Sequence, residues 1–536
     1  MTVGARPVEI VDTTTRDGNQ SLWSATGLTA RETLAIAPTL ERVGFHALDF
    51  TSSTHMAVSV RFHREDPWEL IRLMRAATPG TLLSFITTGM RFIAWQPCDE
   101  DVMRLAFRCV VRNGIRRFQF AEPANDPEAL RRCARIAREE GVEEIVVGLT
   151  YSISPVHTHA YYAERVAALA DCADIGRFYL KDPGGLLTTD AVRELGPHFA
   201  ATGRTVELHS HCTIGLAPLS YMEGLRAGFD VLHTALGPAG NGTSQPTAES
   251  TLRNLEAEGY EHALDTQQLA AASGYFEALV DDKGLPAGRP REYDAAYYHH
   301  QLPGGMVTTT RRMLEEIRRP ELFDAVLDEV VLVRAEMGYP ILVTPVSQLV
   351  AFQATRNVID PERWSNVSDE TVRYFLGHYG AFAAPPDPDV TERVLSLSKV
   401  DAMGEVAPVL LADQHDERRP VDPRRRESAN GVPEPGGRVE EDERGRLACQ
   451  RPARRHPDHR PLVQPEDELE VGRQVDQERH LGRAGVREHP GQPALTKHLD
   501  RRVANGGLRH RATLTVSRDR SRRAAGPPRA RPRRSR

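Results

Sequence analysis

Two histidines separated by a single residue, His209 and His211, form the first pattern in this sequence that can do chemistry. They lie in residues 205–212, one of the short β-branched or apolar runs that predict β-strands, and alternate residues of a strand face the same side. Both imidazoles can therefore bind one divalent cation. An isolated His-x-His is more often a pair of ordinary core or surface histidines, so the metal-site interpretation depends on the rest of the chain.

Three further polar clusters follow predicted strands. They read DTTTRDGNQ at residues 12–20, KDPGG at residues 181–185 and GNGTSQP at residues 240–246. Taken singly, an Arg-Asp pair is usually a salt bridge, a lysine at a strand end usually reaches water, and a glycine-rich loop is usually a turn. Because all of them end strands of one predicted sheet, together they favour a metal site with a carboxylate as a hard oxygen ligand.

The elements that must position these clusters are eight short apolar or β-branched runs that alternate with amphipathic stretches. The predicted strands are residues 8–14, 45–50, 82–89, 115–122, 144–151, 175–182, 205–212 and 231–236. Between them, Thr29 and Glu32 predict a capping box, and Asp126-Pro127 predicts the start of a helix that ends at Gly141. Eight units of about 30 residues predict an α/β fold, a (β/α)8 TIM barrel with its active site at the carboxyl ends of the strands.

A mostly helical domain is predicted after the barrel. We assign residues 1–275 to the barrel and 276–385 to this domain, because residues 321–337 and 346–357 carry apolar side chains at three- and four-residue spacing. Its expected role is packing. No GxGxxG follows a predicted strand, which argues against a dinucleotide-binding sheet.

The last part of the chain, residues 386–536, is rich in Arg and Pro, and we expect it to be a disordered basic tail. From residue 411 onwards 30 Lys and Arg stand against 20 Asp and Glu, and no aromatic residue follows Phe382. Without large apolar groups such a segment cannot offset its ordering entropy. It is either a basic segment for acidic partners or, as we favour, a segment without function, such as DNA translated in a shifted frame. Stacking aromatics are absent, so we do not expect nucleic-acid binding.

Composition places the chain among cytoplasmic proteins. Hydrophobic residues make up 40% of the chain and charged residues 26%, and no apolar run approaches the roughly 18 residues of a membrane-spanning helix. The six cysteines show no CxxC pairing, which is typical of a reducing compartment. We therefore expect neither a membrane span nor a secreted disulfide scaffold.

At its polar clusters the sequence resembles the carboxyltransferase domains of biotin-dependent enzymes, which include pyruvate carboxylase, the oxaloacetate decarboxylase alpha subunit and the keto-acid-carboxylating subunit of transcarboxylase. The signature consists of the Asp-Thr-Thr-x-Arg-Asp-x-x-Gln-Ser run, the Lys-Asp after the sixth strand and the His-x-His. Similar segments continue along the chain: YSISPVHT at 151–158, QLPGGM at 301–306, YPILVTPVSQ at 339–348 and GHYG at 377–380. The resemblance covers roughly residues 8–385.

The resemblance implies a metal site made by Asp17, His209 and His211. It also implies that Lys181 takes up CO2 and becomes a carbamate, which completes the site with an oxygen ligand. A carbamate is anionic, and a mixed nitrogen and oxygen ligand set suits Zn2+, Mn2+ or Co2+. Such a metal would act as a Lewis acid on the carbonyl of the substrate and stabilise its enolate.

Other residues receive roles through the same resemblance. Arg16 is expected to add positive charge near the substrate oxygen, Thr243 matches the family threonine that passes a proton between biotin and the substrate, and Gln20 matches a substrate-contacting glutamine. One position departs from the family. Where members that use pyruvate carry an arginine that grips the carboxylate, this sequence has Thr88. Either Arg91 reaches the substrate from three residues further along, or the substrate is not pyruvate.

The expected function is therefore that of a metal-dependent carboxyltransferase of the transcarboxylase or oxaloacetate decarboxylase type. It would exchange a carboxyl group between carboxybiotin and a 2-oxo acid such as pyruvate or oxaloacetate. No Ala-Met-Lys-Met sequence for biotin attachment and no glycine-rich ATP-binding loop are found. We therefore expect a separate biotin carboxyl carrier protein as partner, a biotin carboxylase or acyl-CoA carboxyltransferase subunit as a second partner, and a homo-oligomer.

Two alternatives stay open. Hydroxymethylglutaryl-CoA lyases and Claisen-type synthases share the Arg-Asp and His-x-His motifs, and Asn241 could imitate the asparagine ligand of the lyases. These lyases lack a lysine at the position of Lys181, which favours the carboxyltransferase. The other alternative is a non-catalytic scaffold subunit that has lost its substrate arginine, although a buried His-x-His without a metal would be costly to keep.

Overall fold

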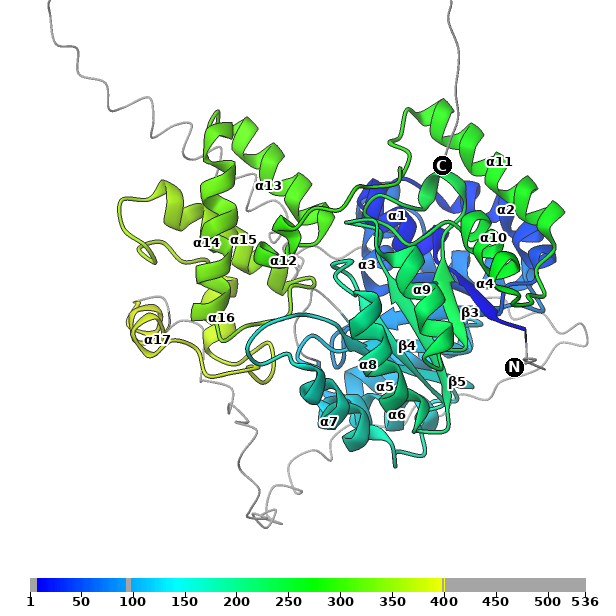
Figure 1. Ribbon diagram of the computed structural model, residues 1–536, viewed down its shortest axis with the longest axis horizontal. Coiled ribbons are helices and arrows are strands. Elements are labelled where there is room, and N and C mark those ends of the chain that lie inside the picture. Colours follow the sequence, from blue (N-terminus) through cyan, green and yellow to red (C-terminus); the bar gives the residue numbers. More distant parts are fainter. Residues whose placement is uncertain (1–6, 93–97, 398–399, 401–536) are drawn as a thin grey trace, which may run out of the picture. The chain divides into compact units, whose positions relative to one another are not determined.

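The computed structural model describes residues 7–92, 98–397 and 400. Eight parallel strands close into a barrel in which each strand pairs with the next and β8 pairs with β1 (Figure 1). The strands are β1 (Glu9–Asp12), β2 (Ala47–Ser52), β3 (Leu82–Thr87), β4 (Arg117–Ala121), β5 (Glu144–Thr150), β6 (Arg177–Asp182), β7 (Thr205–Ser210) and β8 (Val231–Thr234). Each overlaps a predicted run, so the (β/α)8 TIM barrel is confirmed.

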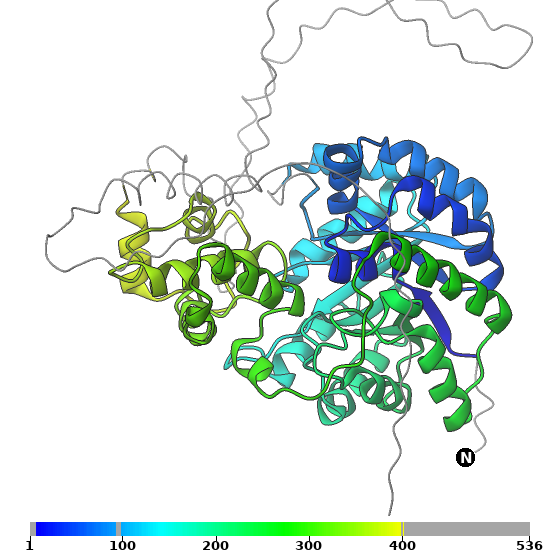
Figure 2. The same ribbon diagram turned by 90° about the horizontal axis from the view of Figure 1, so that it is seen from above.

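Helices connect the strands and cover the barrel. In the barrel part they are α1 (Asn19–Trp23), α2 (Ala30–Val43), α3 (Ser53–Val58), α4 (Pro67–Ala77), α5 (Glu100–Arg112), α6 (Pro127–Glu139), α7 (His159–Leu169), α8 (Thr189–Ala200), α9 (Ala217–Arg226), α10 (Ala248–Glu258) and α11 (Thr266–Lys283). The predicted capping box is present, since the Thr29 side chain accepts from the Glu32 amide and Glu32 accepts from the Thr29 amide. The helix predicted at Asp126-Pro127 begins there as α6. Helices α2 and α11 pack side by side outside the strands (Figures 1 and 2).

The helices after the barrel part are, in chain order, α12 (Ala296–His300), α13 (Gly304–Glu316), α14 (Phe323–Glu336), α15 (Val346–Ile359), α16 (Asp369–Phe375) and α17 (Pro388–Leu395). They confirm the prediction of a mostly helical region. None of the helices in the described part of the chain is both long enough and apolar enough to cross a bilayer.

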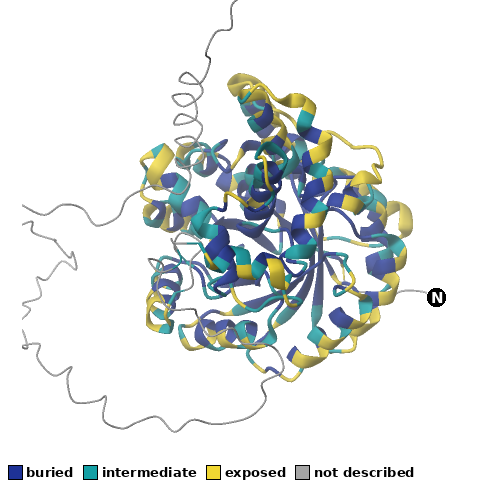
Figure 3. Cartoon of the chain, turned by 90° about the vertical axis from the view of Figure 1, so that its left-hand side faces the viewer, coloured by how far each residue is buried: buried dark blue, intermediate teal, exposed yellow. Residues whose placement is uncertain are grey.

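Two large hydrophobic cores and two small clusters of strand residues organise the described part of the chain. The largest core packs the strands against the helices that cover them and includes Phe276, Val280 and Tyr297, whereas the second core starts at Leu302 and joins α14 to α15. The strands are almost entirely buried and the exposed residues lie on the outer faces of the helices (Figure 3). The boundary predicted at residue 275 falls inside α11 and stays a prediction.

The predicted disordered tail is wrong in its first residues. Residues 388–395 form α17, where Asp387 caps the helix by accepting hydrogen bonds from two backbone amides. Val390 and Val394 are buried in the second core, and this burial stabilises a helix that composition alone did not indicate. The rest of the tail, from residue 401 onwards, lies outside the described residues.

The chain after β1 makes a short turn that sets the position of two predicted site residues. The π-helical turn η1 (Thr14–Gly18) carries Arg16 and Asp17 and leads directly into α1. A Cβ atom at Gly18 would lie 3.0 Å from the carbonyl oxygen of Ala239, so a glycine allows this turn to approach the loop after β8 closely. π-helical turns occur frequently at functional sites.

Candidate active site

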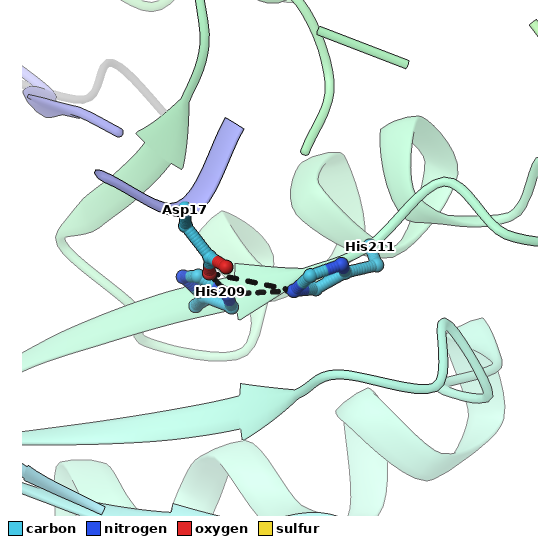
Figure 4. A group of neighbouring side chains, drawn as sticks. All are labelled: Asp17, His209 and His211. Atoms are coloured by element: carbon cyan, nitrogen blue, oxygen red, sulfur yellow. Dashed lines mark hydrogen bonds and ion pairs between the residues drawn. The ribbon is translucent and has the colours of Figure 1, made fainter. Parts of the chain in front are cut away.

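Three side chains from two distant parts of the sequence meet at the carboxyl ends of the barrel strands. One ligand atom each from Asp17, His209 and His211 lies within 4.8 Å of the others, and all three residues are buried (Figure 4). Oδ2 of Asp17 is 3.0 Å from Nε2 of His209 and 3.5 Å from Nε2 of His211. The two imidazoles come from β7 and the residue after it, and the carboxylate comes from η1. This is a donor set that fits one divalent cation.

Lys181, the last but one residue of β6, lies beside this group. Its Nζ is 3.3 Å from Nε2 of His209 and 3.5 Å from Oδ2 of Asp17. Burial disfavours the ammonium ion and lowers the pKa of Lys181, although Asp17 acts in the opposite direction. A larger share of the side chain is therefore the neutral amine, which is the form that can react with CO2.

Arg16 fixes the orientation of Asp17. Its guanidinium donates through Nε to Oδ2 of Asp49 at 2.8 Å, and its Nη1 lies 3.2 Å from Oδ1 of Asp17. Burial alone would raise the pKa of Asp17, but Arg16 and Lys181 outweigh it and hold that pKa well below its usual value. Asp17 is therefore a carboxylate, with Oδ1 turned to Arg16 and Oδ2 turned to the histidines.

The loop after β8 orients His211. Nδ1 of His211 donates to the carbonyl oxygen of Thr243 at 2.6 Å, which leaves its Nε2 facing Asp17. The pKa of His209 is held well below its usual value, first by burial and then by Lys181. His209 is therefore neutral, which is the form in which histidine binds a metal.

Gln245 belongs to the predicted polar cluster 240–246, but the sequence interpretation gave it no role of its own. Its side-chain amide nitrogen lies 3.2 Å from Oδ2 of Asp17, 3.2 Å from Nε2 of His209 and 3.0 Å from Nε2 of His211. Three acceptor atoms thus converge on one electropositive group, as they would on a cation. A buried glutamine in a Gly-rich loop carries no motif of its own, so only the fold reveals it.

A cavity of about 230 Å³ opens beside these residues. The predicted site residues that line it are Arg16, Asp17, Gln20, Thr88, Lys181, His211 and Thr243. The structure therefore brings most of the predicted catalytic, metal and substrate positions to one place. Their individual roles stay predictions.

Arg91 is the predicted site residue that is not brought in. Its Nη1 donates to the carbonyl oxygen of Thr88 at 3.0 Å and lies 3.5 Å from Oε1 of Glu122, while Nη2 donates to the carbonyl oxygen of Tyr379. It is not among the described residues that line the cavity. The guanidinium is therefore engaged with other groups of the protein.

Asn241, the ligand that the lyase alternative requires, is also absent from the described cavity lining. It occupies a turn with a φ of 63°, and its backbone amide donates to the carbonyl oxygen of Gln245. The geometry of this loop thus gives the lyase alternative no support.

The other side of the cavity is formed by residues after the barrel, which the sequence interpretation assigned to packing. Gly304 and Gly305 at the start of α13 line it, together with Thr344 and Ser347. The hydroxyl of Ser347, and that of Thr150 on β5, are buried without a hydrogen-bond partner among the described residues. Such groups are costly unless a ligand satisfies them. The segments 301–306 and 339–348 were recognisable as similar to a family, but spacing does not indicate which segments meet in space.

Known proteins match this chain in both sequence and fold. Residues 297–421 match a model described as a conserved carboxylase domain. A pyruvate carboxylase subunit from Methanocaldococcus jannaschii is 34% identical over 395 residues, which make up 72% of this chain and 68% of that protein. The large subunit of 2-oxoglutarate carboxylase from Hydrogenobacter thermophilus is 28% identical over 399 residues, which make up 74% of this chain and 60% of that protein.

Among solved structures, the carboxyl transferase domain of Rhizobium etli pyruvate carboxylase with pyruvate and biocytin superposes with a TM-score of 0.67. The match covers 73% of this chain and 69% of that one, at 23% sequence identity. At this level of identity the likeness shows the fold alone.

Proposed function

The chain belongs to the carboxyltransferase subunits and domains of biotin-dependent enzymes, and we propose that it transfers a carboxyl group between biotin on a carrier protein and a 2-oxo acid. The observation that carries the proposal is the convergence of Asp17, His209, His211 and Lys181 beside a cavity. These side chains form the set expected for a metal completed by a lysine carbamate.

Lys181 would complete the site by reacting with CO2. Its neutral amine attacks the carbon of CO2, a C–N bond forms while one C=O π bond opens, and the nitrogen passes a proton to water to give an anionic carbamate. The lowered pKa of Lys181 supports this step, because an ammonium ion has no lone pair to attack with. A bound divalent cation would supply Lewis-acid stabilisation of negative charge on the keto oxygen of the substrate.

Neutral polar groups of the cavity wall support a substrate with several oxygen atoms. Gln20 and Thr88 line it, and the hydroxyls of Thr150 and Ser347 have no partner among the described residues. We infer that these neutral groups bind the oxygen atoms of the acid and of the biotin ureido ring. Arg91 is held by Glu122 and does not take part. Pyruvate and 2-oxoglutarate are the first acids to test, since the related enzymes are named for them.

We propose that a hydroxyl group carries the proton that moves between biotin and the substrate carbon next to the keto group. Thr243 was the predicted carrier, but its Oγ1 donates to the carbonyl oxygen of Ser21 at 2.8 Å. Thr344 lines the same cavity from the opposite side. We propose that one of these two threonines relays the proton, and that Thr243→Val and Thr344→Val decide which. The relay variant loses transfer to the acid, whereas the other keeps most of it.

The partners follow from the reaction. A biotin carboxyl carrier protein brings the carboxyl group, and a biotin carboxylase or an acyl-CoA carboxyltransferase subunit loads that carrier. The M. jannaschii relative is named as one subunit of its enzyme, which supports an assembly of separate chains.

The test is a substrate screen with the full-length chain, a carrier whose biotin is carboxylated with labelled bicarbonate, and several 2-oxo acids. The proposal expects label in one acid, with the transfer abolished in Lys181→Ala. Cleavage of hydroxymethylglutaryl-CoA would favour the lyase alternative. A folded chain that binds metal but transfers nothing to any acid, even with an active carrier, would favour the scaffold.

A further inference from the structure

The second ring nitrogen of His209 has a partner that neither the motif nor the cavity reveals. Nδ1 of His209 lies 3.1 Å from Nδ1 of His233 on β8, and both residues are fully buried. The register Glu207↔Val231 and Leu208↔Leu232 between β7 and β8 brings the two rings together, with centroids 5.1 Å apart. Two facing ring nitrogens require one proton between them, because two lone pairs repel and two N–H groups collide.

Glu207 decides where that proton is. Its Oε2 lies 2.8 Å from Nε2 of His233. Arg117, whose guanidinium is always charged, donates to the same oxygen at 2.6 Å, so Glu207 is present as a carboxylate. The carboxylate only accepts, so His233 must donate from Nε2. A neutral His233 then has its lone pair on Nδ1, and the proton between the rings belongs to His209.

The ring of His233 is also held in place. Tyr179 stacks on it, with ring centroids 5.9 Å apart and an interplanar angle of 10°. Glu207 and His209 lie two residues apart on the same face of β7. His233 contacts both of them and so links two residues of one strand. Neither His233 nor Glu207 is among the described residues that line the cavity.

We propose that His233 and Glu207 are positioning residues of the metal site: they hold the proton of His209 on Nδ1 and thereby keep the lone pair of its Nε2 directed at the cation. The inference rests on the proposed metal site and extends it to a layer beneath the ligands. Residues that bind the outer nitrogen of a histidine ligand usually change metal affinity by 10- to 100-fold when they are replaced.

The test compares two variants of His233 in the full-length chain. After removal of bound metal, Zn2+ is titrated against a chromophoric chelator at one pH. His233→Leu removes the acceptor for His209, and we expect Zn2+ affinity to fall by about 10- to 100-fold. His233→Gln can still accept from His209 through its carbonyl and donate to Glu207 through its amide, so we expect an affinity close to that of the wild type.

Gln119→Leu is the matched control, because Gln119 is a fully buried polar residue of β4 that bonds Ser84 instead of the site. It should lose stability but keep Zn2+ affinity. The inference is overturned if a folded His233→Leu binds Zn2+ as tightly as the wild type, if both His233 variants lose it equally, or if the control loses it as much. Each of these results leaves the metal site intact, because the wild type still binds Zn2+. A wild type that binds no Zn2+ would overturn the proposed metal site as well.

Discussion

Nζ of Lys181 lies 3.5 Å from Oδ2 of Asp17 across the mouth of the barrel. Asp17 sits in the turn after β1 and Lys181 near the end of β6, so only closure of the sheet brings them together. The Asp17 carboxylate attracts the protonated form of Lys181 and so opposes the effect of burial on its pKa. Conversion of Lys181 to a carbamate would give it a negative charge, so that both residues could bind one divalent metal.

Replacement of Lys181 by alanine should therefore remove more than a contact. We expect Lys181→Ala to lose carboxyl transfer and to bind Zn2+ over about 100-fold more weakly. This loss is larger than the roughly 10- to 100-fold loss that is usual for residues that contact a metal ligand but not the metal. The control is Lys283→Ala, which removes a lysine paired with Glu32 outside the cavity. Metal titration and labelled transfer check both variants. Full activity in Lys181→Ala would remove the carbamate from the mechanism.

Arg91 and Glu122 form a buried ion pair, and we expect it to support the fold more than the substrate. Arg91→Met leaves Glu122 buried without its cation, which should lower the free energy of unfolding by about 3 kcal/mol with little change in KM. Arg91→Met combined with Glu122→Gln should recover part of that loss. Thr88→Val, in contrast, should raise the KM for the acid about 2- to 10-fold through a lost hydrogen bond. A large rise in KM in Arg91→Met at unchanged stability would show instead that Arg91 reaches the substrate.

Two neighbouring glycines test the contact between α13 and the loop after β8. A Cβ atom at Gly304 would lie 2.3 Å from Cγ2 of Thr243, whereas a Cβ atom at Gly305 has nothing within 4 Å. We expect Gly304→Ala to displace Thr243, to cost about 1–3 kcal/mol of stability and to lower kcat. Gly305→Ala should keep the fold and its stability, because the added Cβ meets no neighbour. Thermal unfolding and labelled transfer check the pair, and equal effects of the two substitutions would contradict the predicted collision.

Asp12 gives a pH dependence of stability. Burial raises its pKa from 3.8 to about 7, and its Oδ2 has no hydrogen-bond partner among the described residues. Between about pH 4 and 7 the folded chain therefore binds more protons than the unfolded chain. The free energy of unfolding falls by roughly 4 kcal/mol as the pH rises through this window. Asp12→Asn should remove this fall. The stability of the variant relative to the wild type should therefore be higher at pH 8 than at pH 5.

The melting temperatures of both proteins at the two pH values measure this gain. Asp190→Asn replaces a carboxylate whose side chain is 81% exposed and should show no such gain. An advantage of Asp12→Asn that is equal at pH 5 and pH 8 would contradict a buried, protonated Asp12.

Much of the fold could be predicted because period-two alternation and helix caps are local signals. Asp17, Lys181, His209 and His211 could be predicted to meet because each follows or ends a parallel strand, and all such ends lie on one face of a barrel. The helix 388–395 was missed because two buried valines, too few to change the local composition, stabilise it.

The rest of the site depends on contacts between distant segments. Gln245 and Ser347 carry no spacing that indicates a role, and the closeness of Ser347 to the barrel mouth follows from packing after the barrel closes. The ion pair of Arg91 with Glu122 likewise joins two strand ends, so the sequence left open whether Arg91 faces the substrate.

The most direct test of the metal centre is the metal content of the purified full-length chain, measured by mass spectrometry after dialysis. Asp17→Asn keeps the size of the side chain but removes its charge, so it serves as the matched variant. The account predicts one divalent metal ion per chain in the wild type and none in Asp17→Asn. A wild type that transfers carboxyl groups at full rate without stoichiometric metal would contradict it.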